Sequence, residues 1–231
     1  MSRFVSGFMA LSLALPLAIG TANAQNPSAK VTAKTSSLVL LPATTGTGDW
    51  QTVLANTLKT ANQKDLFINA SLEVGLYTQT RSNSKNQQSD TSFAKAGVQV
   101  RVLVDGNVVE PGPVVYGRRA QTLTATLEGA IANCLSLVTN ADGSTSIVVD
   151  TNCVTAETIE LILDTTDAAS FNFVAVDVPQ GNHTVVVQAR IDTTTSVEAG
   201  TATALGLVGK GAVTVESVRL RKDPNVILEV P

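Results

Sequence analysis

The sequence has few of the residues on which most enzymatic and metal chemistry depends. Its 231 residues include one histidine, His183, and two cysteines, Cys134 and Cys153. A metal site needs several converging ligands, and a nucleophile needs an activating base. No recognisable Ser or Cys motif accompanies the histidine. The sequence therefore predicts no catalytic, cofactor-binding or metal-ligating residue.

Charged residues are also scarce, since they make up 15% of the chain, and 19 acidic side chains outnumber 16 basic ones. Proteins that bind nucleic acid present clustered Lys and Arg to the phosphates. A polybasic segment is likewise what draws a protein to an anionic membrane surface. The sequence contains neither feature, so no nucleic-acid partner is expected.

The first 24 residues have the pattern of a secretory signal peptide. Arg3 precedes an apolar run at residues 4–20, and Ala22 and Ala24 stand where a signal peptidase requires small residues. Cleavage is expected before Gln25, which predicts a secreted protein, extracellular or periplasmic, without a transmembrane span. Loss of Arg3 leaves 15 basic and 19 acidic side chains, a net charge of −4. A retained membrane anchor is the alternative.

Alternation of apolar and polar residues predicts an all-β protein. The clearest example is residues 65–80, where Leu66, Ile68, Leu72 and Leu76 share one face. Residues 95–104 and 184–192 alternate in the same way. We expect one antiparallel β-sandwich of jelly-roll type over residues 38–222, followed by a tail at 223–231.

Two polar stretches interrupt this alternation. Residues 25–37 lack periodicity and are predicted to be a mobile arm, and residues 81–90 contain no apolar side chain and are predicted to be a long exposed hairpin loop. Near the C-terminus, Gly209 and Gly211 flank one Lys and predict a tight hairpin, and the apolar phase slips near Ser217 as at a β-bulge. Residues 181–221 would then hold three strands.

Residues 128–169 are expected to form an excursion from the sandwich, because they hold both cysteines of the secreted chain. In an exported protein an even pair predicts a disulfide between Cys134 and Cys153. Residues 155–163 after it read either as a short helix capped by Thr155 or as a strand. Residues 140–144 favour a plain turn over a calcium loop, because valines occupy the first and last ligand positions.

Family resemblance enters in the C-terminal third. The segment Gly181–Gln188, preceded by Phe171-x-Phe173 and followed by Val213–Glu216, resembles the closing strands of secreted jelly-roll domains. Similar segments occur in C1q/TNF-like and phage tail-tip β-sandwich proteins. The resemblance implies a sandwich of about ten strands that often trimerises and binds through its loops. It carries over no functional residue.

The function expected from these observations is that of an exported, non-catalytic surface or extracellular protein for binding or assembly. Its partner would be another copy of itself, in a homo-oligomer, or a surface glycan or protein. One alternative is an exported hydrolase acting on glycans, with a carboxylate-lined groove drawn from residues such as Asp164, Asp167 and Asp177. A second is a fibre subunit that donates the arm at residues 25–37 as a strand. His183 is not expected to be a catalytic base, because neither neighbour in sequence is an acid. We expect it to cap the turn with a ring nitrogen or to cover the end of the barrel with its flat apolar surface. Trp50 is expected to be a core plug or a loop anchor.

Overall fold

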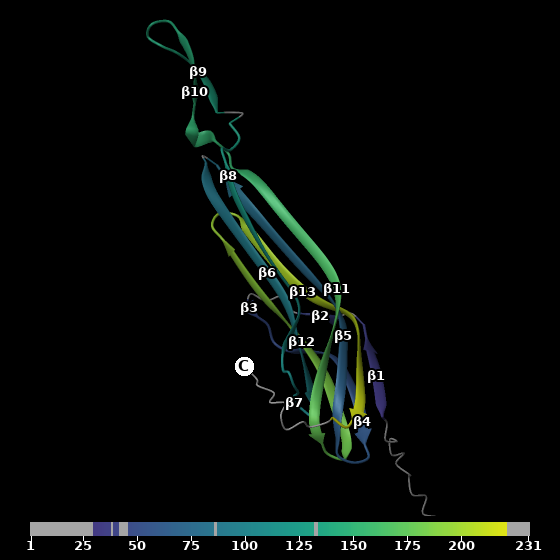
Figure 1. Ribbon diagram of the computed structural model, residues 1–231. Helices are drawn as coiled ribbons and strands as arrows, with labels where there is room; N and C mark the ends of the chain where they lie inside the picture. The colour runs from purple at the N-terminus through teal and green to yellow at the C-terminus, as the bar shows by residue number, and fades with distance from the viewer. Residues whose placement is uncertain (1–29, 38, 42–45, 86, 132–133, 221–231) are drawn as a thin grey trace, which may run out of the picture.

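Two antiparallel sheets pack face to face into an elongated sandwich, from one end of which a hairpin projects (Figure 1). The computed structural model describes residues 30–37, 39–41, 46–85, 87–131 and 134–220. The predicted signal peptide and the tail at residues 223–231 lie outside these ranges. Within them, no helix is long and apolar enough to cross a membrane.

The strands divide between the sheets in the following spatial order. The first sheet contains β1 (Val31–Ser36), β13 (Thr201–Val218), β5 (Lys64–Ser84) and β11 (Glu157–Val178), with β2 (Val39–Leu40) beside β13. The second contains β4 (Gln51–Thr60), β12 (Gly181–Val197), β6 (Gln88–Val104) and β8 (Val114–Leu127), with β3 (Gly46–Thr47) beside β12 and β7 (Asn107–Val108) beside β6.

The pairing of the eight principal strands is nested. In chain order these are β1, β4, β5, β6, β8, β11, β12 and β13, and the first pairs with the last, β4 with β12, β5 with β11, and β6 with β8. Folding such a ribbon of paired strands over itself places alternate pairs in opposite sheets, which is the arrangement of a jelly roll. The predicted antiparallel jelly-roll sandwich is confirmed.

Side chains of the alternating strands fill the space between the sheets as expected. Leu66, Ile68, Leu72 and Val74 of β5 are at most 2% exposed. They face the valines of β6 and β12 that alternation also placed inward. Burying each such side chain contributes roughly 1.5–3 kcal/mol, so these rows hold the two sheets together.

The interior becomes polar toward the end that carries the hairpin. Thr78, Thr80, Ser82 and Ser84 continue the inward-facing row of β5 and are at most 2% exposed. The predicted exposed loop at residues 81–90 is therefore wrong, because β5 runs to Ser84 and β6 begins at Gln88. Ser and Thr face inward there because their hydroxyls find partners, such as the carbonyl oxygen of Asp90, 2.9 Å from Ser82 Oγ.

The predicted hairpin at Gly209 and Gly211 is also wrong. Residues 201–218 form one continuous strand, β13, whose register against β5 shifts between Val208 and Gly211, so the bulge lies here and not near Ser217. A Cβ on Gly209 would collide with the Glu73 side chain, and one on Gly211 with Leu72. The glycines let β5 side chains approach the backbone, and residues 181–218 hold two strands.

Part of the predicted mobile arm is a strand. Residues 31–36 form β1, which pairs with residues 211–216 of β13. This pairing escaped sequence analysis because β1 is an edge strand with largely exposed side chains, and its backbone hydrogen bonds require no apolar alternation. The structure describes only residues 30–37 of the predicted arm.

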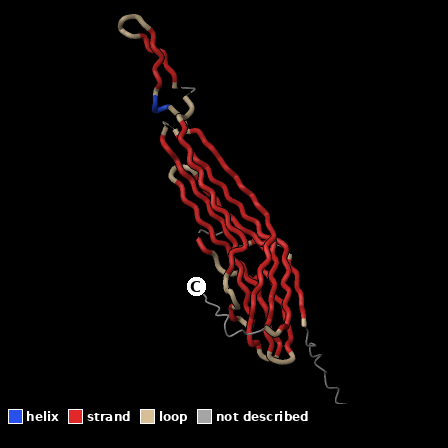
Figure 2. Tube along the Cα trace, viewed as in Figure 1, coloured by secondary structure: helices blue, strands red, loops and turns tan. Residues whose placement is uncertain are grey.

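The excursion is shorter than predicted and contains no α-helix among its described residues (Figure 2). It consists of a hairpin of β9 (Leu135–Thr139) and β10 (Thr145–Val149) and a 3-10 turn at Thr151–Cys153. The chain rejoins the sandwich at Glu157, where β11 pairs with β5 along its length. The helix expected at residues 155–163 is wrong, since pairing to a 21-residue strand overrides local propensity.

Candidate functional site

The structure brings the two cysteines together, as predicted. A disulfide joins Cys134 and Cys153, whose Cα atoms are 5.5 Å apart. It closes the base of the β9–β10 hairpin, where the 3-10 turn leads back toward the sandwich. The tip of the hairpin is a turn in which Gly143 has φ 80° and Asp142 Oδ1 accepts the N–H of Ser144 at 2.9 Å. Residues 140–144 thus form a turn, as predicted.

His183 acquires an acid that its sequence neighbours did not supply. Its Nδ1 lies 2.7 Å from Asp105 Oδ2, because the β6–β7 turn containing Asp105 folds against the start of β12. On the other side Nε2 lies 2.8 Å from the carbonyl oxygen of Pro179 and 3.1 Å from Thr60 Oγ1. The sequence neighbours of His183 offered no acid to orient the ring. The structure shows that an acid distant in sequence, Asp105, does orient it.

Both nitrogens of the His183 ring face oxygen acceptors. The carbonyl oxygen of Pro179, which can only accept, lies against Nε2, and the Asp105 carboxylate lies against Nδ1. Burial raises the pKa of Asp105, but the hydrogen bond with His183, the backbone N–H of Thr184 and the electrostatic attraction of His183 together hold that pKa below its usual range.

The trio of Asp105, His183 and Thr60 has the composition of a catalytic triad but not its chemistry. A general base must accept the hydrogen bond of the nucleophile's hydroxyl. Here the Thr60 hydroxyl donates instead to the Pro179 carbonyl, at 2.7 Å. Both His183 and Thr60 are at most 3% exposed. The arrangement ties the 179–181 turn to β4 and β6.

A hollow of about 530 Å³ lies at the end of the sandwich opposite the hairpin and contains two aspartates. Asp65 is 6% exposed. Its Oδ1 accepts the N–H of Asp177 at 2.9 Å and its Oδ2 accepts the N–H of Leu220 at 2.8 Å. Asp177 in turn accepts from Gln63. Both acids hold chain segments together. Asp164 and Asp167 lie elsewhere, on the exposed part of β11.

Trp50 lies over the outer face of the second sheet as an anchor. The guanidinium carbons of Arg101 and Arg190 are each 4.4 Å from the centroid of its ring, in cation–π contact. Arg101 Nε donates to Gln188 and Arg190 Nε to Gln99, both at 2.9 Å. Burial, and then the charge of Arg190, lower the pKa of Arg101. This cluster fixes the start of β4 against β6 and β12.

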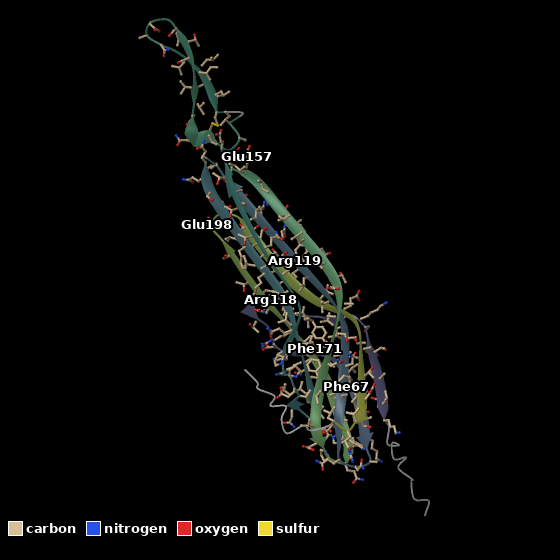
Figure 3. All side chains as sticks on the ribbon, in the orientation of Figure 1. Phe67, Arg118, Arg119, Glu157, Phe171 and Glu198 are labelled. Carbon is tan, nitrogen blue, oxygen red and sulfur yellow. A yellow bond between two sulfur atoms is a disulfide. The ribbon has the colours of Figure 1, made fainter. Side chains whose placement is uncertain are left out.

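The adjacent arginines of β8 differ in direction (Figure 3). Arg118 is exposed, whereas Arg119 is half-buried and its Nη1 lies 3.5 Å from the carbonyl oxygen of Leu76. Two adjacent arginines within a strand predict one exposed side chain and one paired with an acidic neighbour. One arginine is exposed as predicted, but the other contacts a backbone carbonyl and not an acidic side chain.

Among the described residues, the two large apolar side chains with the highest exposed fractions, Leu137 and Ile147, lie in the hairpin. Leu137 pairs with Ile147 and Leu135 with Val149, so these four side chains share one face. Their exposed fractions are 74, 68, 53 and 43%. Val138 and Val148 are exposed on the other face. A two-stranded hairpin cannot bury such residues by itself, and the hairpin therefore presents an apolar surface.

A second exposed feature begins at the same end. In β11 the side chains of Ile159, Leu161 and Leu163 point toward the interior side, like their partners Ser82, Thr80 and Thr78 of β5, yet they remain 39–42% exposed. β11 is the outermost strand of its sheet. The sandwich is consequently open along this edge, where β8 of the opposite sheet leaves the row partly uncovered.

The sequence analysis predicted neither of these exposed features. Comparisons with known proteins identify no functional feature either. No family model and no curated protein matches the chain. Among solved structures, a chain of the T13 IBDV viral particle aligns over 90% of this chain and 48% of that chain, with 12% identity and a TM-score of 0.17. A likeness this low carries no argument. Within the described residues no group of three or more His, Cys, Asp or Glu side chains could hold a metal ion.

Proposed function

We propose that the protein is an exported, non-catalytic assembly subunit that associates with further copies of itself. The observation that carries this proposal is the apolar face of the β9–β10 hairpin, formed by Leu135, Leu137, Ile147 and Val149. Because these four side chains are partly exposed, burying them fully against a partner would contribute roughly 4–7 kcal/mol before the costs of association. Contiguous exposed apolar surface of this kind is typical of an interaction site.

Two features favour a copy of the same chain as the partner. Interfaces between identical subunits are more apolar than interfaces that form transiently, and the hairpin face contains no charged side chain. The open β11 edge lies at the same end of the molecule (Figure 1), so this end carries two exposed apolar features. Export and the resemblance to secreted jelly-roll domains are part of this proposal.

The test compares the molar mass of the exported chain with that of a hairpin variant. Size-exclusion chromatography with light scattering should show oligomers for the native chain and monomers for Leu137→Ser/Ile147→Ser. The matched control is Ser136→Thr, which alters the other face of the same hairpin. A native chain that stays monomeric at high micromolar concentration contradicts the proposal.

A further inference from the structure

Among the strands that the structure describes, β11 pairs with β5 alone and forms the outer edge of its sheet. In an antiparallel strand, alternate residues direct both N–H and C=O to the same side. Val174 donates its N–H to Glu110 at 2.9 Å and so points away from β5. The register of β11 against β5 is continuous from Glu157 to Ala175. Residues of the same parity, including Thr158, Glu160 and Ile162, therefore direct their backbone groups to the open edge.

The part of this edge that could accept another strand ends before Asp167. The N–H of Ala168 is capped by its neighbour Asp167, whose Oδ1 is 2.8 Å away. Such a charged residue blocks strand pairing at an edge. Farther along, Val174 is already bridged to Glu110. The edge open to another strand is thus residues 158–166, the stretch that carries the exposed Ile159, Leu161 and Leu163.

The sequence after β13 has the pattern of a strand that would fit this edge. Following Pro224, residues 225–230 read Asn-Val-Ile-Leu-Glu-Val. Val226, Leu228 and Val230 alternate with Asn225, Ile227 and Glu229. The three valine and leucine side chains have the spacing of Ile159, Leu161 and Leu163. On the opposite face, Ile227 would lie beside Ile162, which is 51% exposed.

We propose that residues 225–230 of one copy add as a strand to residues 158–166 of β11 in a second copy. The proposal rests on the proposed function, self-assembly, and specifies its contact. Backbone hydrogen bonds to the open edge would provide affinity, and the alternating apolar side chains would fill the gap between β11 and β8. In β8, Leu123 and Leu127 are half-buried, and Leu123 shares the face of its partner Ser92, which is fully buried.

Distances require that the donor strand come from another copy. Leu220 is hydrogen-bonded to Asp65 at the end of β5 opposite the hairpin. The acceptor residues 158–166 pair with Gly75 to Asn83 of β5, at least 10 strand residues from Asp65, or about 33 Å. The chain from Leu220 to Val226 spans at most about 22 Å. The described chain therefore ends, at Leu220, on the side of the sandwich opposite the acceptor, and the proposed contact is head-to-tail between copies.

The experiment has two parts. First, light scattering compares the exported chain with Leu228→Asp, which places a charge on the apolar face of the donor, and with the control Asn225→Ser on its polar face. We expect Leu228→Asp to abolish chain growth and Asn225→Ser to leave it unchanged. If Leu228→Asp assembles like the native chain, strand donation is wrong while self-assembly stands. If the native chain is monomeric, self-assembly itself is wrong.

The second part tests the acceptor in the Leu228→Asp background, using a fluorescent peptide of residues 223–231. Ile162→Pro removes an edge N–H that β5 does not use, so the fold should persist by circular dichroism while peptide affinity falls at least tenfold. The matched control Ala168→Pro removes an edge N–H already occupied by Asp167 and should not change affinity. No peptide binding, or equal binding by both proline variants, overturns the proposal.

Discussion

Asp90 offers the sharpest test of the polar half of the interior. Its side chain is buried, and the residue is 3% exposed. Oδ2 accepts the N–H of Asn83 at 2.6 Å and the hydroxyl of Ser82 at 3.1 Å, and Oδ1 accepts the N–H of Ala199 at 2.9 Å. Asp90→Asn keeps the shape but turns one accepting oxygen into a donor that faces another donor. With hydrogen bonds to a charged group worth about 1.5–3 kcal/mol each, we expect a loss of about 2–4 kcal/mol at pH 7.

The pH dependence of this loss identifies its cause. Burial raises the pKa of Asp90, but the backbone N–H groups of Asn83 and Ala199 and the Ser82 hydroxyl outweigh it, so the folded-state pKa lies below its usual value. Stability from a depressed carboxyl pKa is present above the unfolded-state pKa, about 3.9, and is lost as pH falls through the folded-state value.

Urea unfolding of the native chain and Asp90→Asn at several pH values between 7 and 2 measures this difference. We expect the gap in free energy of unfolding to be full at pH 7 and to shrink below about pH 4. A gap of the same size at pH 7 and pH 2 would refute the argument, because it would arise from packing and not from the carboxylate. No gap at pH 7 would show that the hydrogen bonds contribute nothing.

Three further predictions concern other parts of the fold. Leu72→Ala should lower the free energy of unfolding by about 2–5 kcal/mol by leaving a cavity, whereas Gln79→Ala on the outer face should change it by less than about 0.5 kcal/mol; equal losses in urea unfolding would contradict the register of β5. Replacing Cys134 and Cys153 by Ser should speed limited proteolysis within the hairpin and leave the melting temperature of the sandwich nearly unchanged; unaltered cleavage would count against the disulfide as the clamp of its base. His183→Gln should cost about 1–3 kcal/mol in urea unfolding, and an unchanged midpoint would argue against the hydrogen bond with Asp105.

Sequence patterns predicted the strands whose inward face is aliphatic. In β5, β6 and β12 the period-two rows of Leu, Ile, Val and Ala are the buried rows of the structure. The patterns failed where the inward face is hydroxylated. Thr78 to Ser84 alternates like the residues before it, but a hydrophobicity pattern cannot distinguish a buried Ser with partners from an exposed Ser.

Contacts between residues distant in sequence explain the other failures. Asp105 is 78 residues from His183 and meets it only because two turns converge. A glycine can be required either in a tight turn or where another side chain approaches the backbone closely. The local sequence around Gly209 and Gly211 favoured a turn. In the structure the glycines are required because the side chains of Leu72 and Glu73 approach the backbone of β13.

The polar interior and the open edge have a common physical consequence. At the end bearing the hairpin, buried hydroxyls replace the aliphatic rows, and a buried hydrogen bond contributes only about 1 kcal/mol net, compared with roughly 1.5–3 kcal/mol for a buried Leu or Val. The inward-facing Ile159, Leu161 and Leu163 of β11 contribute less still, because they are partly exposed. This end therefore gains the most from an added strand that covers those three side chains. The opposite end, with its aliphatic core and with Asp65 holding the start of the C-terminal segment, gains little. Under the proposed strand donation, such asymmetry would favour growth in one direction, with the self-sufficient end of one copy completing the open end of the next.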